Sequence, residues 1–287
     1  MTRGALIFAH NSRDVDYAVC AVVAGGLAGK NLQIPVSLVT DESTVKWMKQ
    51  SSYYDKAIKT FDQIIIVEKP TTTNKRTLHD GASANVVPFV NSNRANAWEL
   101  TPYDETLLLD SDYLIFTDTL NQYWELENDV LISTAMNDIQ GDRKGFLDNH
   151  VSETGVHLYW ATTVMFKKNE RSKLFFDLVD NIRKNYNYFA DIYRFNSSQF
   201  RNDIAFSIAK HILEGFTTDT RENLPPVLTA IDKDILHSVC EKTGKLTFMI
   251  SNAAADKFYL ASIKEMDVHI INKQSIVRHS QSLLELI

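Results

Sequence analysis

The segment "TPYDETLLLDSDYLIFTD" (residues 101–118) places two aspartates, one residue apart, directly after a run of leucines. A short aliphatic run without polar alternation predicts a strand buried on both faces, as in a parallel sheet covered by helices. Asp110 and Asp112 would stand at the end of that strand, where open α/β sheets bind ligands. Because burying two unpaired carboxylates costs several kcal/mol, we expect a cation to compensate them.

The chain contains three Asp-x-Asp triplets, so the spacing alone has little specificity. Asp14 and Asp16 precede a predicted helix, where capping explains them. Asp232 and Asp234 follow a loop beside a lysine, which favours a solvated face. The pair that ends the leucine run is therefore the candidate for chemistry.

Carboxylates at positions i and i+2 point to the same side of an extended chain, so Asp110 and Asp112 can face one ion. Oxygen ligands favour Mg²⁺ or Mn²⁺, which complete their coordination with phosphate oxygens. This chemistry suits departure of a nucleoside diphosphate. The alternative is a turn in which both aspartates are merely solvated.

Around this segment, aliphatic runs alternate with amphipathic stretches, which predicts an α/β fold with a partly parallel sheet. Helical spacing of apolar residues predicts helices over 16–31, 170–193 and 198–215, so the second half is the more helical. The polar stretch 137–155 has three glycines and no periodicity, which indicates an active-site flap or a disordered excursion. The predicted strands are 5–9, 35–40, 63–68, 106–109, 113–116 and 130–134.

The composition is that of an ordinary folded domain, with 44% hydrophobic residues in 287. A net charge of −6 argues against nucleic acid as the main partner, because binding phosphates normally needs a basic face. Two cysteines without a framework pattern favour a reducing compartment. No apolar run is long enough for a signal peptide core or a membrane span, so we expect a cytoplasmic protein.

In order and motif, these segments resemble the GT-A glycosyltransferases, especially the glycogenin-like and galactosyltransferase-like group of nucleotide-diphospho-sugar transferases. The resemblance implies a Rossmann-type mixed sheet flanked by helices, with a more helical C-terminal acceptor half. It implies one catalytic domain over 1–287. The nucleotide-binding half would be 1–135, and 136–287 would bind the acceptor and carry a C-terminal segment for metal and diphosphate.

The resemblance also implies roles for single residues. Asp110, Asp112 and His269, in "DVHIINKQSIVRH" (267–279), would hold Mn²⁺ or Mg²⁺, and Lys273 would contact the diphosphate. The family's glycine and Lys-Pro-Trp ending is absent here, so His279 is the alternative third ligand.

Other residues would contact the donor sugar. Thr162 and Thr163 in "HLYWATTVMFKK" (157–168) would line its pocket, unless this is a plain core strand. Asp203 in "FRNDIAF" (200–206) would act on the sugar as a catalytic carboxylate, or would only favour the positive end of its helix. Arg94 would approach the nucleotide-sugar, or would form a surface salt bridge.

The loops that follow the first two strands would hold the nucleotide base, because ligands lie beyond strand ends in this class of sheet. His10, Asn11 and Tyr17 come from the first loop, and Asp41 from the second. No G-x-G-x-x-G follows the first strand and no Walker A sequence occurs, which argues against dehydrogenases and P-loop kinases.

The function implied is transfer of a sugar, from a UDP-sugar by preference, to an acceptor hydroxyl of a carbohydrate or protein. A hydroxymethylated DNA base is a less favoured acceptor, for which 71–81 and 142–145 would form a basic rim. The resemblance leans towards retention of configuration, although Asp-x-Asp serves both outcomes. The alternatives are a sugar-nucleotide pyrophosphorylase and a non-catalytic nucleotide-sugar-binding protein.

Overall fold

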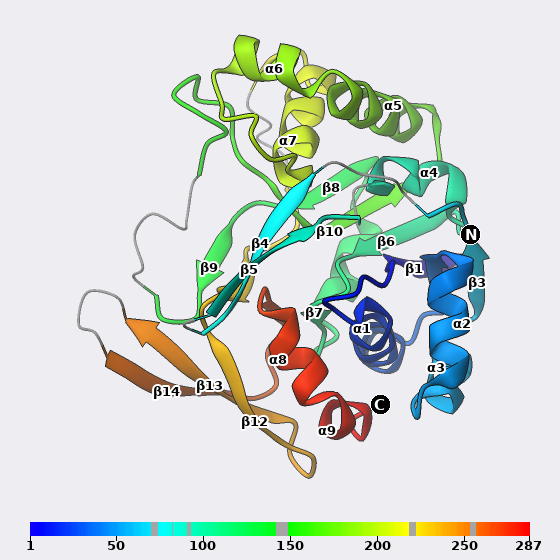
Figure 1. Cartoon of the computed structure of the whole chain (residues 1–287). Helices are drawn as coiled ribbons and strands as arrows, with labels where there is room; N and C mark the ends of the chain where they lie inside the picture. The colour runs from blue at the N-terminus through cyan, green and yellow to red at the C-terminus, as the bar shows by residue number, and fades with distance from the viewer. Residues whose placement is uncertain (70–73, 82, 91–92, 142–148, 218–221, 253–256) are drawn as a thin grey trace.

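A mixed six-stranded sheet forms the centre of the protein (Figure 1). The computed structural model describes residues 1–69, 74–81, 83–90, 93–141, 149–217, 222–252 and 257–287. The strand order is β3-β2-β1-β6-β10-β8; β1, β2, β3 and β6 run parallel, and β10 is antiparallel to both its neighbours. The strands are β1 (Arg3–Phe8), β2 (Val36–Thr40), β3 (Gln63–Ile66), β6 (Glu105–Leu109), β8 (Val130–Ser133) and β10 (Trp160–Lys167).

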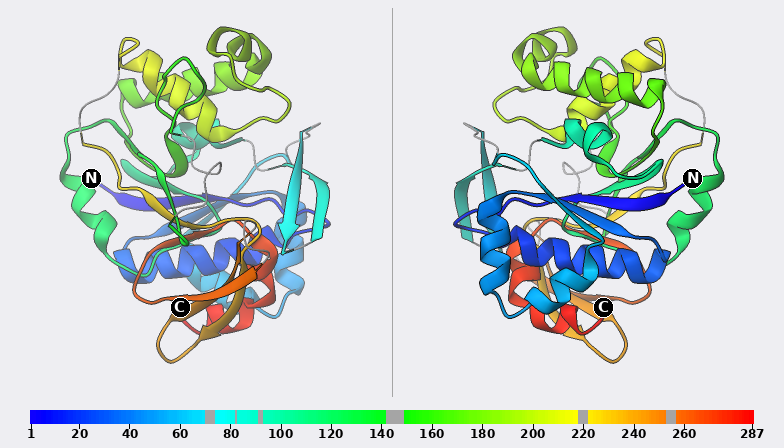
Figure 2. Two further views of the ribbon diagram at one scale, coloured as in Figure 1. Left: turned by 90° about the vertical axis from the view of Figure 1, so that its left-hand side faces the viewer. Right: turned by 90° about the vertical axis from the view of Figure 1, so that its right-hand side faces the viewer.

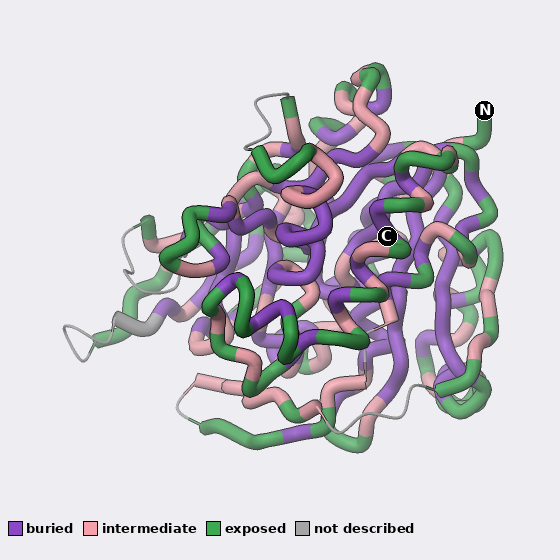
Figure 3. The backbone as a smooth tube through the Cα atoms, turned by 90° about the horizontal axis from the view of Figure 1, so that it is seen from above, coloured by how far each residue is buried: buried purple, intermediate pink, exposed green. Residues whose placement is uncertain are grey.

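Each face of this sheet carries its own hydrophobic core, because side chains alternate between the faces along a strand. Ile7 and Leu107 belong to the core beneath α1, whereas Leu6 and Leu108 belong to the core beneath α5 and α7. The central strands are buried and the outer helices are exposed on their far sides (Figure 3). Burial of all five residues of β6 confirms the strand expected from the leucine run.

The helices on the two faces come from different parts of the chain (Figures 1 and 2). Asp16 caps α1 by accepting a hydrogen bond from the Val19 N–H at 3.1 Å. Capping was expected of Asp14 and Asp16, and it is confirmed for Asp16. The helices are α1 (Tyr17–Leu32), α2 (Glu42–Gln50), α3 (Tyr54–Thr60), α4 (Ala97–Leu100), α5 (Glu170–Lys184), α6 (Tyr186–Tyr193), α7 (Asn202–Leu213), α8 (Lys273–Arg278) and α9 (Ser280–Leu284), with 3₁₀ turns η1 (Asn93–Asn96) and η2 (Thr119–Glu125).

Three smaller sheets complete the described part of the chain. A four-stranded sheet has the order β7-β15-β11-β9, an antiparallel sheet has the order β12-β13-β14, and β4 and β5 form a separate hairpin. Their bounds are β4 (Lys75–Asp80), β5 (Ser83–Pro88), β7 (Tyr113–Leu114), β9 (Met136–Asp138), β11 (Val227–Ala230), β12 (Ile235–Cys240), β13 (Lys245–Asn252), β14 (Lys257–Ile263) and β15 (Val268–Ile270).

The α/β class, the mixed sheet and its flanking helices agree with the sequence analysis. The five strands between Val227 and Ile270 were not predicted. β11 and β15 are short and pair with distant segments, whereas β12, β13 and β14 form successive antiparallel hairpins with many exposed side chains. Of the stretch 137–155, residues 142–148 lie outside the described residues. Within the described ranges, none of the helices has the length and hydropathy needed to cross a bilayer.

Candidate metal and nucleotide-sugar site

The two aspartates after β6 lie on a tight turn. The Tyr113 N–H donates to the Asp110 carbonyl at 3.2 Å, and the Ile270 N–H donates to the Asp112 carbonyl at 2.9 Å. The chain between β6 and β7 is therefore not extended, and the expected i, i+2 geometry is wrong. The turn still brings both carboxylates together, and burial of Asp112 to 1% exposure excludes a pair that is merely solvated.

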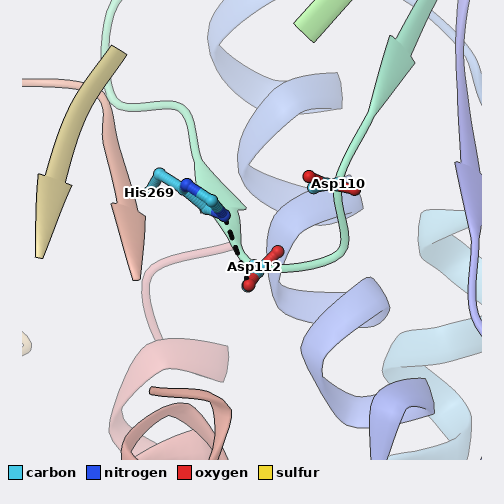
Figure 4. Close-up of side chains that lie close together, drawn as sticks. All are labelled: Asp110, Asp112 and His269. Atoms are coloured by element: carbon cyan, nitrogen blue, oxygen red, sulfur yellow. Dashed lines mark ion pairs between the residues drawn. The ribbon is translucent and has the colours of Figure 1, made fainter. Parts of the chain in front are cut away.

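His269 joins the two aspartates from another sheet. It lies on β15, where it is paired with Tyr113 of β7 on one side and Thr229 of β11 on the other. One ligand atom from each of Asp110, Asp112 and His269 lies within 4.8 Å of the others (Figure 4). The pairing of β15 with the strand that follows the turn is thus what assembles this cluster.

Asp112 is the most strongly held member of the cluster. Its Oδ2 accepts from the Lys273 ammonium and lies 3.3 Å from His269 Nε2. Burial raises the pKa of Asp112, but the charges of Lys273 and His269 outweigh burial and hold that pKa well below its usual range. Burial lowers the pKa of Lys273, and the Asp112 charge more than restores it, so both groups are ionised.

The donor set fits a divalent cation of the Mg²⁺ or Mn²⁺ type. Two carboxylates and one imidazole supply oxygen and nitrogen ligands, and Asp110 retains 33% side-chain exposure towards the cavity. Three protein ligands leave room for phosphate oxygens or water. His279, the alternative ligand, is instead the residue that ends α8 and is not part of the described three-residue cluster.

A cavity of about 450 Å³ opens above this cluster. It brings together the ends of β6 and β15, the start of α7 and the hairpin β4–β5. Of the residues singled out in the sequence, the cavity is lined by Tyr17, Arg94, Asp110, Asp112, Thr162, Asp203, His269 and Lys273.

Arg94 reaches the cavity from η1, just before the strand that leads to the turn. Its Nη1 lies 3.0 Å from Asp110 Oδ1 and also donates to the Ala161 carbonyl. The side chain of Arg94 is only 4% exposed, so the pair is not the surface salt bridge considered above. Its Nε and Nη2 have no hydrogen-bond partner among the described residues, which leaves buried donors facing a ligand site.

Asp203 stands in the first turn of α7 and lines the cavity. Its carboxylate accepts two hydrogen bonds from Arg201, through Nε at 3.1 Å and through Nη2. Both carboxylate oxygens of Asp203 are therefore engaged by the same guanidinium. The neighbouring Asn202 also lines the cavity, and its buried Oδ1 has no hydrogen-bond partner among the described residues.

Four residues predicted to contact the donor do not line the cavity: His10, Asn11, Asp41 and Thr163. His10 Nδ1 lies 2.9 Å from Asp41 Oδ2, and Asp41 caps α2 through the Thr44 N–H. Burial raises the pKa of Asp41, but hydrogen bonds from Ser43, His10 and Thr44 hold it far below its usual range.

Asn11 and Thr163 are likewise engaged within the protein. Asn11 accepts from the Ala18 N–H at 2.7 Å, and the Thr163 hydroxyl bonds to that of Ser133. These contacts hold the loops and strands around the cavity, and the predicted contacts of all four residues with a donor stay predictions.

Some residues of the cavity were not predicted from the sequence. Asp232 was expected on a solvated face, but it lines the cavity and its Oδ1 is buried, while Asp234 is only 1% exposed. Asp232 follows β11, which is parallel to β15, so strand pairing would have revealed it. Trp160 and Arg201 also line the cavity, and they lie within the segments 157–168 and 200–206 quoted above, where they were given no role.

Neither a protein-family model nor a curated protein matches the sequence. The glycosyltransferase GlyE of Streptococcus pneumoniae TIGR4 matches with a TM-score of 0.40 and 14% identity over 74% of this chain, which spans only 43% of that protein.

In two other solved structures, the match covers a larger share of the known protein. The galactosyltransferase LgtC, in complex with donor and acceptor sugar analogs, matches with a TM-score of 0.41 and 13% identity, over 72% of this chain and 70% of its own. Mouse xyloside xylosyltransferase 1 matches with a TM-score of 0.44 and 11% identity, over 74% and 83%. The three proteins are named as a glycosyltransferase, a galactosyltransferase and a xylosyltransferase.

Proposed function

We propose that the protein is a metal-dependent glycosyltransferase that moves a sugar from a nucleoside-diphosphate sugar, UDP-sugar by preference, to an acceptor hydroxyl. The observation that carries the proposal is the cluster of Asp110, Asp112 and His269 at the base of a cavity. Five basic side chains line the same cavity, which supports an anionic ligand: Lys75, Arg76, Arg94, Arg201 and Lys273.

The chain's own groups have distinct roles in this proposal. A divalent cation held by the cluster would supply Lewis-acid stabilisation of the diphosphate leaving group. Arg94 orients Asp110 and offers its two remaining buried donors to the donor molecule. Asp203, paired with Arg201, binds a hydroxyl of the transferred sugar. Lys273 balances the charge of Asp112 and adds positive charge beside the diphosphate.

The acceptor is a hydroxyl of a carbohydrate or protein, with a hydroxymethylated DNA base less favoured at a net charge of −6. Trp160 supports a ring-shaped acceptor, because it lies in the cavity wall and its ring already receives the Arg201 guanidinium at 5.9 Å. An acceptor that stacks on Trp160 would use the other face of the indole.

The test is incubation with a panel of sugar nucleotides in Mn²⁺ or in chelator, with mass spectrometry of the products. We expect metal-dependent release of one nucleoside diphosphate, lost in Asp110→Asn and Asp112→Asn. Asp14→Asn is the matched control, since Asp14 is an exposed member of another Asp-x-Asp triplet.

The same assay, together with a titration of UDP in chelator, separates the alternatives. Formation of a nucleoside triphosphate when pyrophosphate is added would indicate a pyrophosphorylase. Tight binding of UDP without metal and without turnover of any donor would indicate a non-catalytic binding protein, and either result would refute the proposal.

A further inference from the structure

The cations around the cavity differ in how their charge is already balanced. Arg94 pairs with Asp110, Lys273 pairs with Asp112, and Arg201 pairs with Asp203. Each of these three ion pairs has a net charge close to zero before any ligand binds. None of the three cations therefore supplies an uncompensated positive charge for a diphosphate.

Two cations on β4, Lys75 and Arg76, are the exceptions. Both line the cavity, and neither forms an ion pair with a carboxylate of the described residues. Lys75 is exposed to solvent, whereas Arg76 is half-buried, so Arg76 is the better placed of the two to face a ligand in the cavity. Its guanidinium carbon lies 5.3 Å from the ring centroid of Phe89, which follows the partner strand β5. This stacking holds the planar group in place while its N–H donors stay available.

Arg76 and Lys273 line the same cavity, but Lys273 is already paired with Asp112. An anion bound between the two side chains would therefore meet an uncompensated positive charge at Arg76.

The hairpin that carries Arg76 is fixed to the segment that carries Lys273. Asp80 accepts from Asn272 Nδ2 at 3.2 Å and from Arg278, and His79 Nε2 lies 3.5 Å from Asp232 Oδ2. At the tip, Gly81 has a φ of +61°, and a Cβ there would meet Ile235 Cδ1 at 2.7 Å. The hairpin is thus anchored beside α8 (Figures 1 and 2), which presets the position of Arg76 relative to Lys273.

We propose that Arg76 is the principal cation for the donor diphosphate, held on the β4–β5 hairpin, while Lys273 mainly balances Asp112. This inference rests on the proposed function and assigns part of the predicted basic rim 71–81 to the donor rather than to a DNA acceptor. It also makes the hairpin a determinant of affinity for diphosphate over monophosphate nucleotides.

The experiment is calorimetric titration of UDP and UMP into the full chain in Mn²⁺, at low and high salt. Arg76→Gln should weaken UDP binding roughly 10- to 100-fold, the range for a charge-assisted hydrogen bond, and should weaken UMP binding less. Arg76→Lys should recover part of the loss and keep the salt dependence of UDP binding. Mn²⁺ binding without nucleotide should stay at the wild-type value in both variants.

Lys46→Gln is the matched control, because Lys46 is exposed on α2 and the substitution changes net charge equally. If wild type binds UDP and Arg76→Gln binds it equally well, this inference fails while the proposed function stands. The inference also fails if Arg76→Gln weakens UMP and UDP binding by the same factor. If wild type binds no UDP in Mn²⁺, both the inference and the proposed function fail.

Discussion

Replacing Lys273 with methionine should show how strongly the metal-site carboxylate depends on its internal counter-ion. The Lys273 and Asp112 side chains are 8% and 2% exposed, so the substitution leaves a buried carboxylate without its ammonium. Breaking such a pair by removing one partner costs about 3–5 kcal/mol. His269 Nε2 remains 3.3 Å from Asp112 Oδ2, so we expect a loss near the lower limit, about 3 kcal/mol.

A double-mutant cycle separates the pairing from the lost packing. Lys273→Met, Asp112→Asn and the double variant would be unfolded with urea in a chelator, followed by the fluorescence of the four tryptophans. Urea is uncharged and leaves the ion pair unscreened. The double variant should be more stable than the sum of the single losses predicts, by at least about 2 kcal/mol.

The control Lys46→Met should change the free energy of unfolding by less than about 0.5 kcal/mol, since Lys46 is exposed. Adding Mn²⁺ should stabilise Lys273→Met more than wild type, because Asp112 no longer pairs with an ammonium. A Lys273→Met variant as stable as wild type, or single losses that simply add, would refute this account of the site.

Two further predictions concern the surroundings of the site. Burial lowers the pKa of His10, against the opposing effect of Asp41, so the unfolded chain takes up a proton near pH 6.5 that the folded protein binds only at lower pH. The free energy of unfolding should therefore fall as pH drops below about 6.5. His10→Asn should reduce that fall. Urea titrations in which the variant and the wild type show the same pH dependence would contradict this prediction. Phe175 is fully buried, and its ring centroid lies 5.5 Å from that of Phe206. Phe175→Ala should therefore lower the free energy of unfolding by about 3–5 kcal/mol. A loss below about 1 kcal/mol would show that the contact between α5 and α7 is not part of the core.

The features predicted correctly from the sequence are those encoded by neighbouring residues. The leucine run before Asp110 predicts a doubly buried strand, and the structure buries all of β6. Asp16 ahead of an apolar periodic stretch predicts the start of α1. Periodicity and caps depend on a few adjacent positions, so they can be read without knowledge of the fold. Periodicity does not settle every position within a helix, since Leu174 of α5 is apolar and yet 52% exposed.

The residues that surround the aspartates depend on contacts between distant segments. His269 approaches Asp112 because β15 pairs with β7, and Arg76 faces the cavity because its hairpin is anchored at Asp80 to α8. Short strands such as β7 and β15 carry too few residues for a distinctive pattern, so the sequence does not reveal their partners. The prediction that Asp110 and Asp112 lie on an extended chain was wrong because it, too, depends on a contact with a distant segment. The turn that brings Asp110 and Asp112 together is held by Ile270, and that contact exists only when the two sheets are packed.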